Sequence, residues 1–219
     1  IGRALLSNPR LMLMDEPLAS LDAGRRKEII PFLDRVRHEF DIPIVYVTHN
    51  IQEILHLADT LVVIGDGRIR GVGSVEEILS KKSLRQWTGI HDAGTVFVAK
   101  VEDNDTEGLT TLAFEGGKLK VPDGPPKGSS VRVRVPALNV SISLEKPKQI
   151  SVLNIFQGTI INVEQDGKQV DIQIDVGIPL WARITAHSAA RLNLKSGVRA
   201  YALIKAVSVD RERRGQGVS

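Results

Sequence analysis

Two adjacent carboxylates at the end of an apolar run are the first residues of this chain suited to chemistry. Leu11-Met12-Leu13-Met14 leads directly into Asp15, Glu16 and Pro17. A continuous apolar run that ends in a turn indicates a parallel strand buried on both faces, whose carboxyl end meets the ligand crevice of an α/β sheet. Mg²⁺ binds one or two carboxylates together with phosphate oxygens. We therefore expect Asp15 to lie nearest a metal and Glu16 to face a water, although this tripeptide alone is more often a solvated turn.

A histidine stands at the end of a second apolar run. Ile44–Val47 predicts another buried strand, followed by Thr48 and His49. The residues between the two runs suffice for one helix and a return crossover, so the two strand ends are expected to lie side by side. That helix is predicted over Ala23–Phe40, with Asp22 as its N-cap.

The order and spacing of three short motifs resemble those of ABC transporter ATPases. Leu13-Met14-Asp15-Glu16-Pro17 resembles the Walker B strand, Ser20-Leu21-Asp22 the D-loop, and Thr48-His49-Asn50 the H-loop. The resemblance implies that ATP is sandwiched between two subunits, with Ser20 and Asp22 at the nucleotide and dimer interface. It also implies that Asp15 helps to hold Mg²⁺, that Glu16 orients or deprotonates the attacking water, and that His49 contacts the γ-phosphate.

Two motifs of that family do not occur in this sequence. The 219 residues contain neither a Gly-x-x-x-x-Gly-Lys-Ser/Thr phosphate loop nor the Ser-Gly-Gly signature that precedes Walker B in the family. The chain is therefore interpreted as the C-terminal part of a longer subunit. Because the phosphate loop provides most contacts to the phosphates, we predict that this chain alone does not hydrolyse ATP.

Composition excludes several classes of protein. With 42% hydrophobic and 25% charged residues, the chain is ordinary for a soluble protein of one large or two small domains. It has no cysteine, which excludes a disulfide framework and a thiolate metal site. No run approaches the roughly 20 apolar residues of a membrane span, so membrane association is expected to go through partners. A net charge of +3 does not by itself indicate a nucleic-acid partner.

From about Gly89 the helical spacing gives way to short alternating runs separated by turns, which predicts an all-β region. We assign residues 1–90 to an ATPase part, 91–147 to a first β-barrel half, 148–212 to a second half and 213–219 to a disordered tail. Basic residues between Lys118 and Lys148 could form a nucleic-acid face. Because few aromatic residues accompany them for base stacking, a solvated charged surface is favoured and no nucleic acid is expected.

A partial repeat relates the two β halves. Val131-Arg132 and Val140-Ser141-Ile142 match Val198-Arg199 and Val207-Ser208-Val209 at one offset (198 − 131 = 207 − 140 = 67). In the second half Val170, Ile172, Ile174 and Val176 alternate with Asp171, Gln173 and Asp175, which predicts one core face and one wet face. A short helix is expected over Ser188–Leu192.

The second half resembles the molybdate-binding Mop/TOBE domain. The matching residues are Ser151-x-x-Asn154-x-x-x-Gly158, Thr185-x-x-Ser188, Leu194-Lys195-x-Gly197 and Ile204-Lys205-Ala206. A tetrahedral oxyanion needs hydroxyl or backbone donors and a cation, and the candidate set is Ser151, Thr185, Ser188 and Lys205. Only the second half carries this lysine, since the position equivalent to Lys205 is Leu138.

Together the two resemblances point to the ATP-binding subunit family of bacterial molybdate importers, with a regulatory oxyanion domain. They imply ATP and Mg²⁺ as cofactors, molybdate or tungstate as ligand, and a homodimer. They also imply membrane permease subunits, an external molybdate-binding protein as an indirect partner, and the cytoplasmic face of the inner membrane as the location. Two alternatives stay open: an importer ATPase for another solute, such as a sugar, with a structural β platform, and a non-enzymatic oxyanion module.

Overall fold

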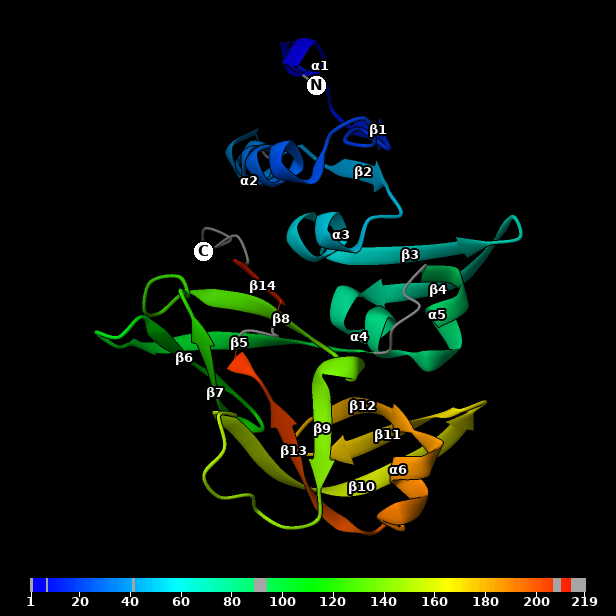
Figure 1. Cartoon of the computed structure of the whole chain (residues 1–219). Coiled ribbons are helices and arrows are strands. Elements are labelled where there is room, and N and C mark those ends of the chain that lie inside the picture. Colours follow the sequence, from blue (N-terminus) through cyan, green and yellow to red (C-terminus); the bar gives the residue numbers. More distant parts are fainter. Residues whose placement is uncertain (1, 7, 41, 89–93, 207–209, 214–219) are drawn as a thin grey trace.

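The computed structural model describes residues 2–6, 8–40, 42–88, 94–206 and 210–213, and it is mostly sheet. Helices and short strands form the N-terminal part at one end of the molecule, and two five-stranded sheets form the β region at the other end (Figure 1). No described helix is long and apolar enough to cross a lipid bilayer. Apart from Arg213, the tail predicted to be disordered lies outside the described residues.

The N-terminal part begins with a parallel strand pair joined through a helix. Helix α1 spans Gly2–Leu6, strand β1 Met12–Asp15, helix α2 Ala23–Phe40 and strand β2 Ile44–Val47. The two strands pair in parallel from Met12 opposite Ile44 to Asp15 opposite Val47. The predicted cap of α2 is confirmed, because the Arg25 backbone N–H donates to Asp22 Oδ1 at 3.0 Å.

The expectation that β1 and β2 are buried on both faces is wrong. Met12 and Met14 pack in one cluster with Ile30 and Leu33 of α2, so one face of the strand pair is covered. Leu13, on the other face, is 72% exposed, and Val45 and Val47 of β2 are each 52% exposed. The described elements supply a helix for one face of this small sheet and leave the other in solvent.

Short elements follow in the order predicted. Helix α3 spans Ile51–Leu57, and β3 (Thr60–Gly65) and β4 (Arg68–Ser74) form the expected hairpin. Next come α4 (Val75–Ser80), the 3₁₀ turn η1 (Lys82–Leu84) and α5 (Arg85–Thr88). The predicted start of α4 is confirmed, since the Ser74 side chain accepts the Glu77 backbone N–H at 3.2 Å.

The β region consists of two five-stranded sheets. The first has the order β14-β8-β5-β6-β7, and its strands are Asp210–Arg213, Ser130–Pro136, Gly94–Asn104, Leu109–Phe114 and Gly117–Pro122. The second has the order β12-β11-β10-β13-β9, and its strands are Pro179–Thr185, Gln169–Asp175, Asn154–Asp166, Arg199–Ile204 and Val140–Ser143. The 3₁₀ turn η2 (Ala137–Asn139) precedes β9. Helix α6 (Ala186–Arg191) precedes β13 and begins two residues before the predicted helix.

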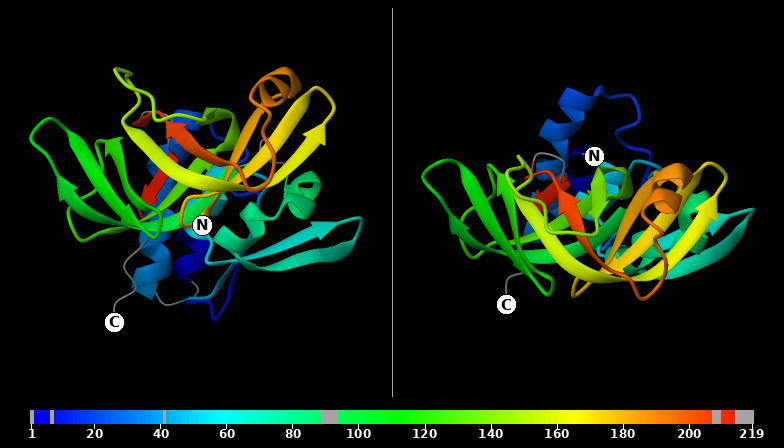
Figure 2. Two further views of the ribbon diagram at one scale, coloured as in Figure 1. Left: turned by 90° about the horizontal axis from the view of Figure 1, so that it is seen from below. Right: turned by 60° about the horizontal axis from the view of Figure 1, so that its bottom comes forward.

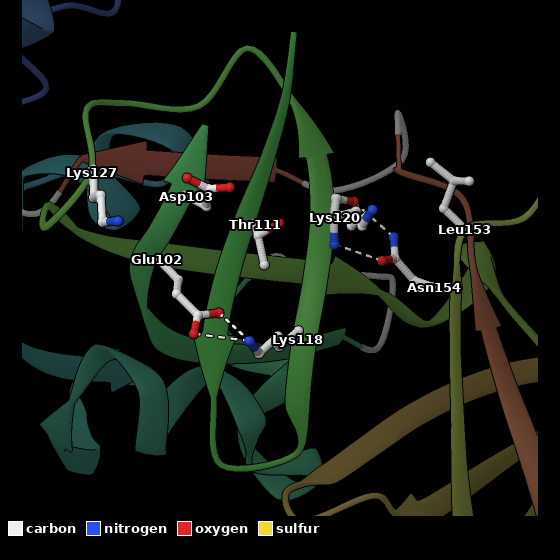
Figure 3. Close-up of a pocket in the computed structure, with 8 residues that line it drawn as sticks. All are labelled: Glu102, Asp103, Thr111, Lys118, Lys120, Lys127, Leu153 and Asn154. Carbon is white, nitrogen blue, oxygen red and sulfur yellow. Dashed lines mark hydrogen bonds and ion pairs between the residues drawn. The ribbon is translucent and has the colours of Figure 1, made fainter. Parts of the chain in front are cut away.

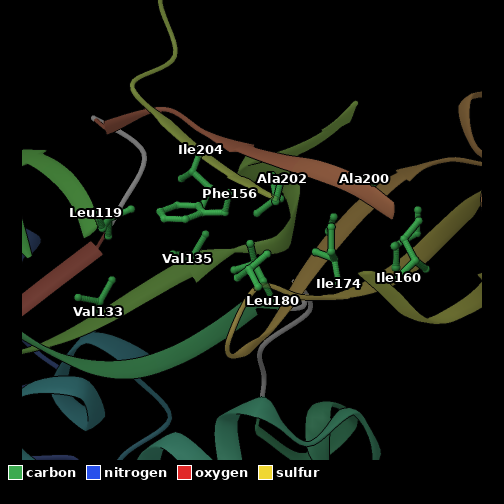
Figure 4. Packing of buried hydrophobic residues seen from close by; sticks show 14 of the residues in the cluster. Leu119, Val133, Val135, Phe156, Ile160, Ile174, Leu180, Ala200, Ala202 and Ile204 are labelled. Atoms are coloured by element: carbon green, nitrogen blue, oxygen red, sulfur yellow. The ribbon is translucent and has the colours of Figure 1, made fainter. Parts of the chain in front are cut away.

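Each half of the repeat gives its last strand to the sheet of the other half. Strand β9, from the first half, pairs with β13 of the second, and β14, from the second half, pairs with β8 of the first. Figure 2 shows the ribbons of the two sheets side by side. The inner faces of both sheets contribute to one continuous hydrophobic cluster (Figure 4). The two halves are therefore interlocked and share a core.

The predicted wet face of β11 is wrong at one position. Asp171 is fully buried, because it lies opposite Arg183 of β12 in the strand register. The guanidinium donates from Nε to Asp171 Oδ1 at 2.7 Å and from Nη2 to Oδ2 at 2.9 Å. A bidentate pair of this kind offsets much of the desolvation cost of the carboxylate.

Candidate functional site

The ends of β1 and β2 bring an acid and a histidine together, as the spacing of the two apolar runs predicted. Glu16 Oε1 lies 2.5 Å from His49 Nδ1 and also accepts the His49 backbone N–H at 3.2 Å. Glu16 has a left-handed backbone, with φ of 43°, where the chain turns out of β1. Such a conformation is uncommon outside glycine and is a frequent property of functional turns. The His49 side chain is 84% exposed, so a ligand could reach it from solvent.

The other residues assigned to the nucleotide site lie on the same short stretch. Asp15 is exposed at the end of β1, and Ser20 is exposed in the loop before α2. Asp22 also faces solvent and, besides capping α2, lies 3.6 Å from Arg25 Nε. Among the described residues, no three His, Cys, Asp or Glu side chains converge as a metal cage. The exposed carboxylate of Asp15, next to Glu16, is a suitable ligand for Mg²⁺ when phosphate and water oxygens complete the coordination of the ion.

A buried polar network behind Glu16 and His49 was not predicted from the sequence. Its centre is Glu53, a residue of α3 that is only 2% exposed. The Glu53 carboxylate accepts hydrogen bonds from Tyr46 Oη at 2.9 Å and Thr48 Oγ1 at 2.8 Å. Burial, and then the hydrogen bond to Glu53, raises the pKa of Tyr46, so the phenol stays protonated and donates. The sequence does carry one sign of this network: the charged residue Glu53 stands between Ile51 and Ile54, which were expected to face inward.

An arginine of the first sheet joins the β region to the N-terminal part. Arg132 of β8 is 2% exposed, and its Nη1 donates to the carbonyls of Leu55 at 2.6 Å and Ala58 at 3.0 Å. Its Nε donates to Glu76 Oε1 of α4 at 2.9 Å. One guanidinium thus binds the C-terminal end of α3 and a side chain of α4.

The four oxyanion candidates lie in two pairs at opposite ends of the second sheet. Asn154 pairs with Ile204, so exposed Ser151 and Lys205 lie at the start of β10 and the end of β13. Thr185 instead lies opposite Gln169, beside the turn at the other end of β10. Strand β10 has 13 residues, so its ends lie about 40 Å apart along the curved strand at roughly 3.3 Å per residue.

Within the second pair the two hydroxyls contact each other. Thr185 Oγ1 lies 2.9 Å from Ser188 Oγ and accepts the Ser188 backbone N–H at 3.1 Å, which caps α6. One chain therefore presents a serine and a lysine at one end of the sheet and two hydroxyls at the other.

A shallow hollow of about 540 Å³ lies near the Ser151 and Lys205 end (Figure 3). It is lined by Glu102, Asp103, Thr111, Lys118, Lys120, Lys127, Leu153 and Asn154. Lys118 is paired with Glu102 at 2.7 Å. The Asn154 side chain bonds both the backbone N–H of Lys120, at 2.7 Å, and its carbonyl, at 2.9 Å. This asparagine of the Mop-like motif thus fastens β7 to the start of β10.

The glycine of the same motif has a steric explanation. Gly158 lies where β10 passes β11, and a Cβ atom there would come within 2.3 Å of the Asp175 carbonyl oxygen. Only glycine permits this close approach of the two strands.

Comparison with known proteins agrees with these observations. Residues 150–210 match the family model described as the TOBE domain. These 61 residues (210 − 150 + 1) of the 219 are similar to the TOBE domain. The molybdenum import ATP-binding protein ModC of Rhodospirillum rubrum is 44% identical over 221 residues, which is 97% of this chain and 60% of that protein. ModC of Paramagnetospirillum magneticum is 40% identical, over 96% of this chain and 59% of that protein.

The chain thus has ModC homologues along nearly its whole length, and it spans about 60% of the length of these curated relatives. A solved structure of the cytoplasmic molybdate-binding protein ModG, with molybdate bound, is 23% identical and overlaps at a TM-score of 0.49. That overlap covers 53% of this chain and 94% of ModG.

Proposed function

We propose that this chain is part of the ATP-hydrolysing subunit of a molybdate or tungstate importer. The observation that carries the proposal is the pairing of Glu16 with His49 at the ends of two parallel strands. It is supported by ModC relatives that align along 97% and 96% of the chain. In the intact subunit ATP is the substrate. Two copies form a homodimer beneath membrane permease subunits, on the cytoplasmic face of the membrane, supplied by an external molybdate-binding protein.

In this proposal the chain's own residues mainly position the reactants. Glu16 accepts a proton from, or orients, the attacking water, and His49 contacts the terminal phosphate. Asp15 would hold Mg²⁺, which supplies charge neutralisation on the phosphates when bound. Ser20 and Asp22, exposed beside this edge, contact the partner subunit or its nucleotide. In phosphoryl transfer such positioning and electrostatic stabilisation provide most of the rate enhancement.

We further propose that the TOBE region binds the oxyanion between two copies of the chain. The separation of Ser151 and Lys205 from Thr185 and Ser188 supports this arrangement, because the two pairs cannot surround one small anion within a single chain. In a dimer the lysine end of one copy meets the hydroxyl end of the other. The four residues supply hydroxyl groups and one ammonium group, which can donate hydrogen bonds to an oxyanion. Two carboxylates, Glu102 and Asp103, line the hollow near the lysine end.

Titration calorimetry on the 219-residue chain tests the oxyanion site, with molybdate, tungstate and sulfate at several protein concentrations. A hydrogen bond to a charged group contributes about 1.5–3 kcal/mol. Lys205→Ala should therefore weaken molybdate binding by roughly one to two decades. Lys100→Ala, an exposed lysine of β5, is the matched control and should leave the affinity unchanged. Sulfate should bind more weakly than molybdate because it is smaller and the donors are fixed.

A mixing experiment tests the contribution of two copies. Lys205→Ala and Ser188→Ala chains should each bind weakly alone. Combined at equal amounts, randomly paired dimers should regain about a quarter of the tight sites, since each mixed dimer has one intact site. Absence of molybdate heat at concentrations where the wild-type chain dimerises would contradict the site and favour the importer with a structural β platform.

A further inference from the structure

Glu53 is a charged side chain enclosed within the N-terminal part. An unpaired buried carboxylate is strongly unfavourable, so its partners explain its presence. Both hydroxyl donors, Tyr46 and Thr48, bind the same oxygen, Oε2. The other oxygen, Oε1, lies 3.4 Å from Arg26 Nε of α2. Glu53 therefore connects α3 to the end of β2 on one side and to α2 on the other.

Arg26 extends this connection to the loop that contains Ser20. Its Nη2 donates to the Leu21 carbonyl at 3.1 Å and approaches the Leu18 carbonyl at 3.5 Å. These carbonyls belong to the segment between Glu16 and Asp22. The Arg26 side chain is 24% exposed. Partial burial strengthens hydrogen bonds relative to solvent-exposed ones.

Thr48 extends the connection to His49. The Thr48 hydroxyl donates to Glu53 and accepts the Asn50 backbone N–H at 3.0 Å. The backbone is thus held on both sides of His49, whose own N–H and ring contact Glu16.

We propose that Glu53 is a positioning residue for ATP hydrolysis, which holds the His49 segment and the Ser20–Asp22 loop at a fixed separation through Thr48 and Arg26. It touches neither reactant. It sets where His49 meets Glu16 and how the loop is presented to the partner subunit. This inference rests on the proposed ATPase function of the intact subunit.

The first test measures amide hydrogen exchange in the 219-residue chain. Glu53→Gln should raise exchange at least about tenfold at residues 18–22 and 48–50, because local opening is no longer opposed by the network. Exchange in the second sheet should stay at its wild-type rate. Glu28→Gln, an exposed glutamate of α2, is the matched control and should change neither segment. Unchanged exchange at both segments in Glu53→Gln would overturn the proposal.

The second test measures ATP turnover by the longer subunit that contains this chain. Glu53→Gln should lower kcat by about 10- to 100-fold with little change in KM for ATP, as expected when catalytic groups are displaced by about 1 Å. Glu28→Gln should turn over like wild type. If Glu53→Gln does not fold, Thr48→Val removes one hydroxyl at constant shape and should show the same selective loss of kcat.

The outcomes separate the two claims. A wild-type subunit without ATP turnover would contradict the proposed function itself. Normal turnover in both Glu53→Gln and Thr48→Val, beside an active wild type, would overturn the positioning role alone and leave Glu53 as a purely structural residue.

Discussion

Replacing Arg132 tests how the β region is fastened to the N-terminal part. Arg132→Met keeps the apolar stem of the side chain and removes the guanidinium. The carbonyls of Leu55 and Ala58 then lose the hydrogen bonds from Arg132, and Glu76 loses its ion pair with the same arginine. Leaving a buried acceptor without a donor lowers the free energy of unfolding by about 1–3 kcal/mol, and breaking a buried ion pair lowers it by about 3–5 kcal/mol.

These costs overlap, because one guanidinium serves all three acceptors and Glu76 keeps partial access to water. Glu76 is 21% exposed, so breaking its ion pair with Arg132 should cost the low end of the range given for buried ion pairs. We therefore expect Arg132→Met to lower the free energy of unfolding by about 3 kcal/mol. The loss should fall on the junction, since α3, α4 and β5 share one apolar cluster there.

Urea denaturation followed by far-ultraviolet circular dichroism measures this loss, and amide exchange locates it at α3 and α4. Arg199→Met, an exposed arginine of β13, is the matched control and should cost under about 0.5 kcal/mol. A loss in Arg132→Met no larger than in Arg199→Met would refute the claim that this arginine ties the two parts together.

Three further predictions follow from single contacts or motifs. The 219-residue chain alone should show no ATP turnover in a coupled phosphate assay, and turnover that Glu16→Gln abolishes would contradict this. Asp171→Asn should lower the free energy of unfolding by about 3 kcal/mol in urea denaturation because it removes the buried negative charge that pairs with Arg183, whereas exposed Asp103→Asn should not. In an absorbance titration of the two tyrosines, Tyr46 should ionise above the ordinary tyrosine range, and Tyr46→Phe should remove that step. Because the folded-state pKa of Tyr46 is raised, its contribution to stability is present below about pH 10 and is lost as the pH rises beyond it; a normal Tyr46 titration would contradict the buried contact with Glu53.

The sequence predicted the parts of the molecule that depend on local pattern and on chain length between motifs. The meeting of Glu16 and His49 follows from two apolar runs separated by one helix. The caps at Asp22 and Ser74 follow from residue type and position alone. The 67-residue offset (198 − 131) stays a prediction of two related β halves, because Val207, Ser208 and Val209 of its second copy lie outside the described residues.

Features that depend on distant partners were not predicted. The alternation in β11 placed Asp171 in solvent, and only its register with Arg183 explains its burial. Strands β9 and β14 are four residues each, too short for their sequence to specify which sheet they join. Motif spacing grouped Ser151 with Thr185, although the length of β10 separates them. Glu53 was missed because its partners come from α2 and β2.

Uptake of molybdate by the assembled importer tests the central proposal most directly. The proposed longer subunit, which would contain this chain, is placed with its proposed permease subunits in vesicles, and labelled molybdate is followed with and without ATP. The proposal predicts uptake that requires ATP, that tungstate competes for, and that Glu16→Gln abolishes while ATP binding is retained. Molybdate uptake that persists in Glu16→Gln, or ATP-driven uptake of a sugar with none of molybdate, would contradict it.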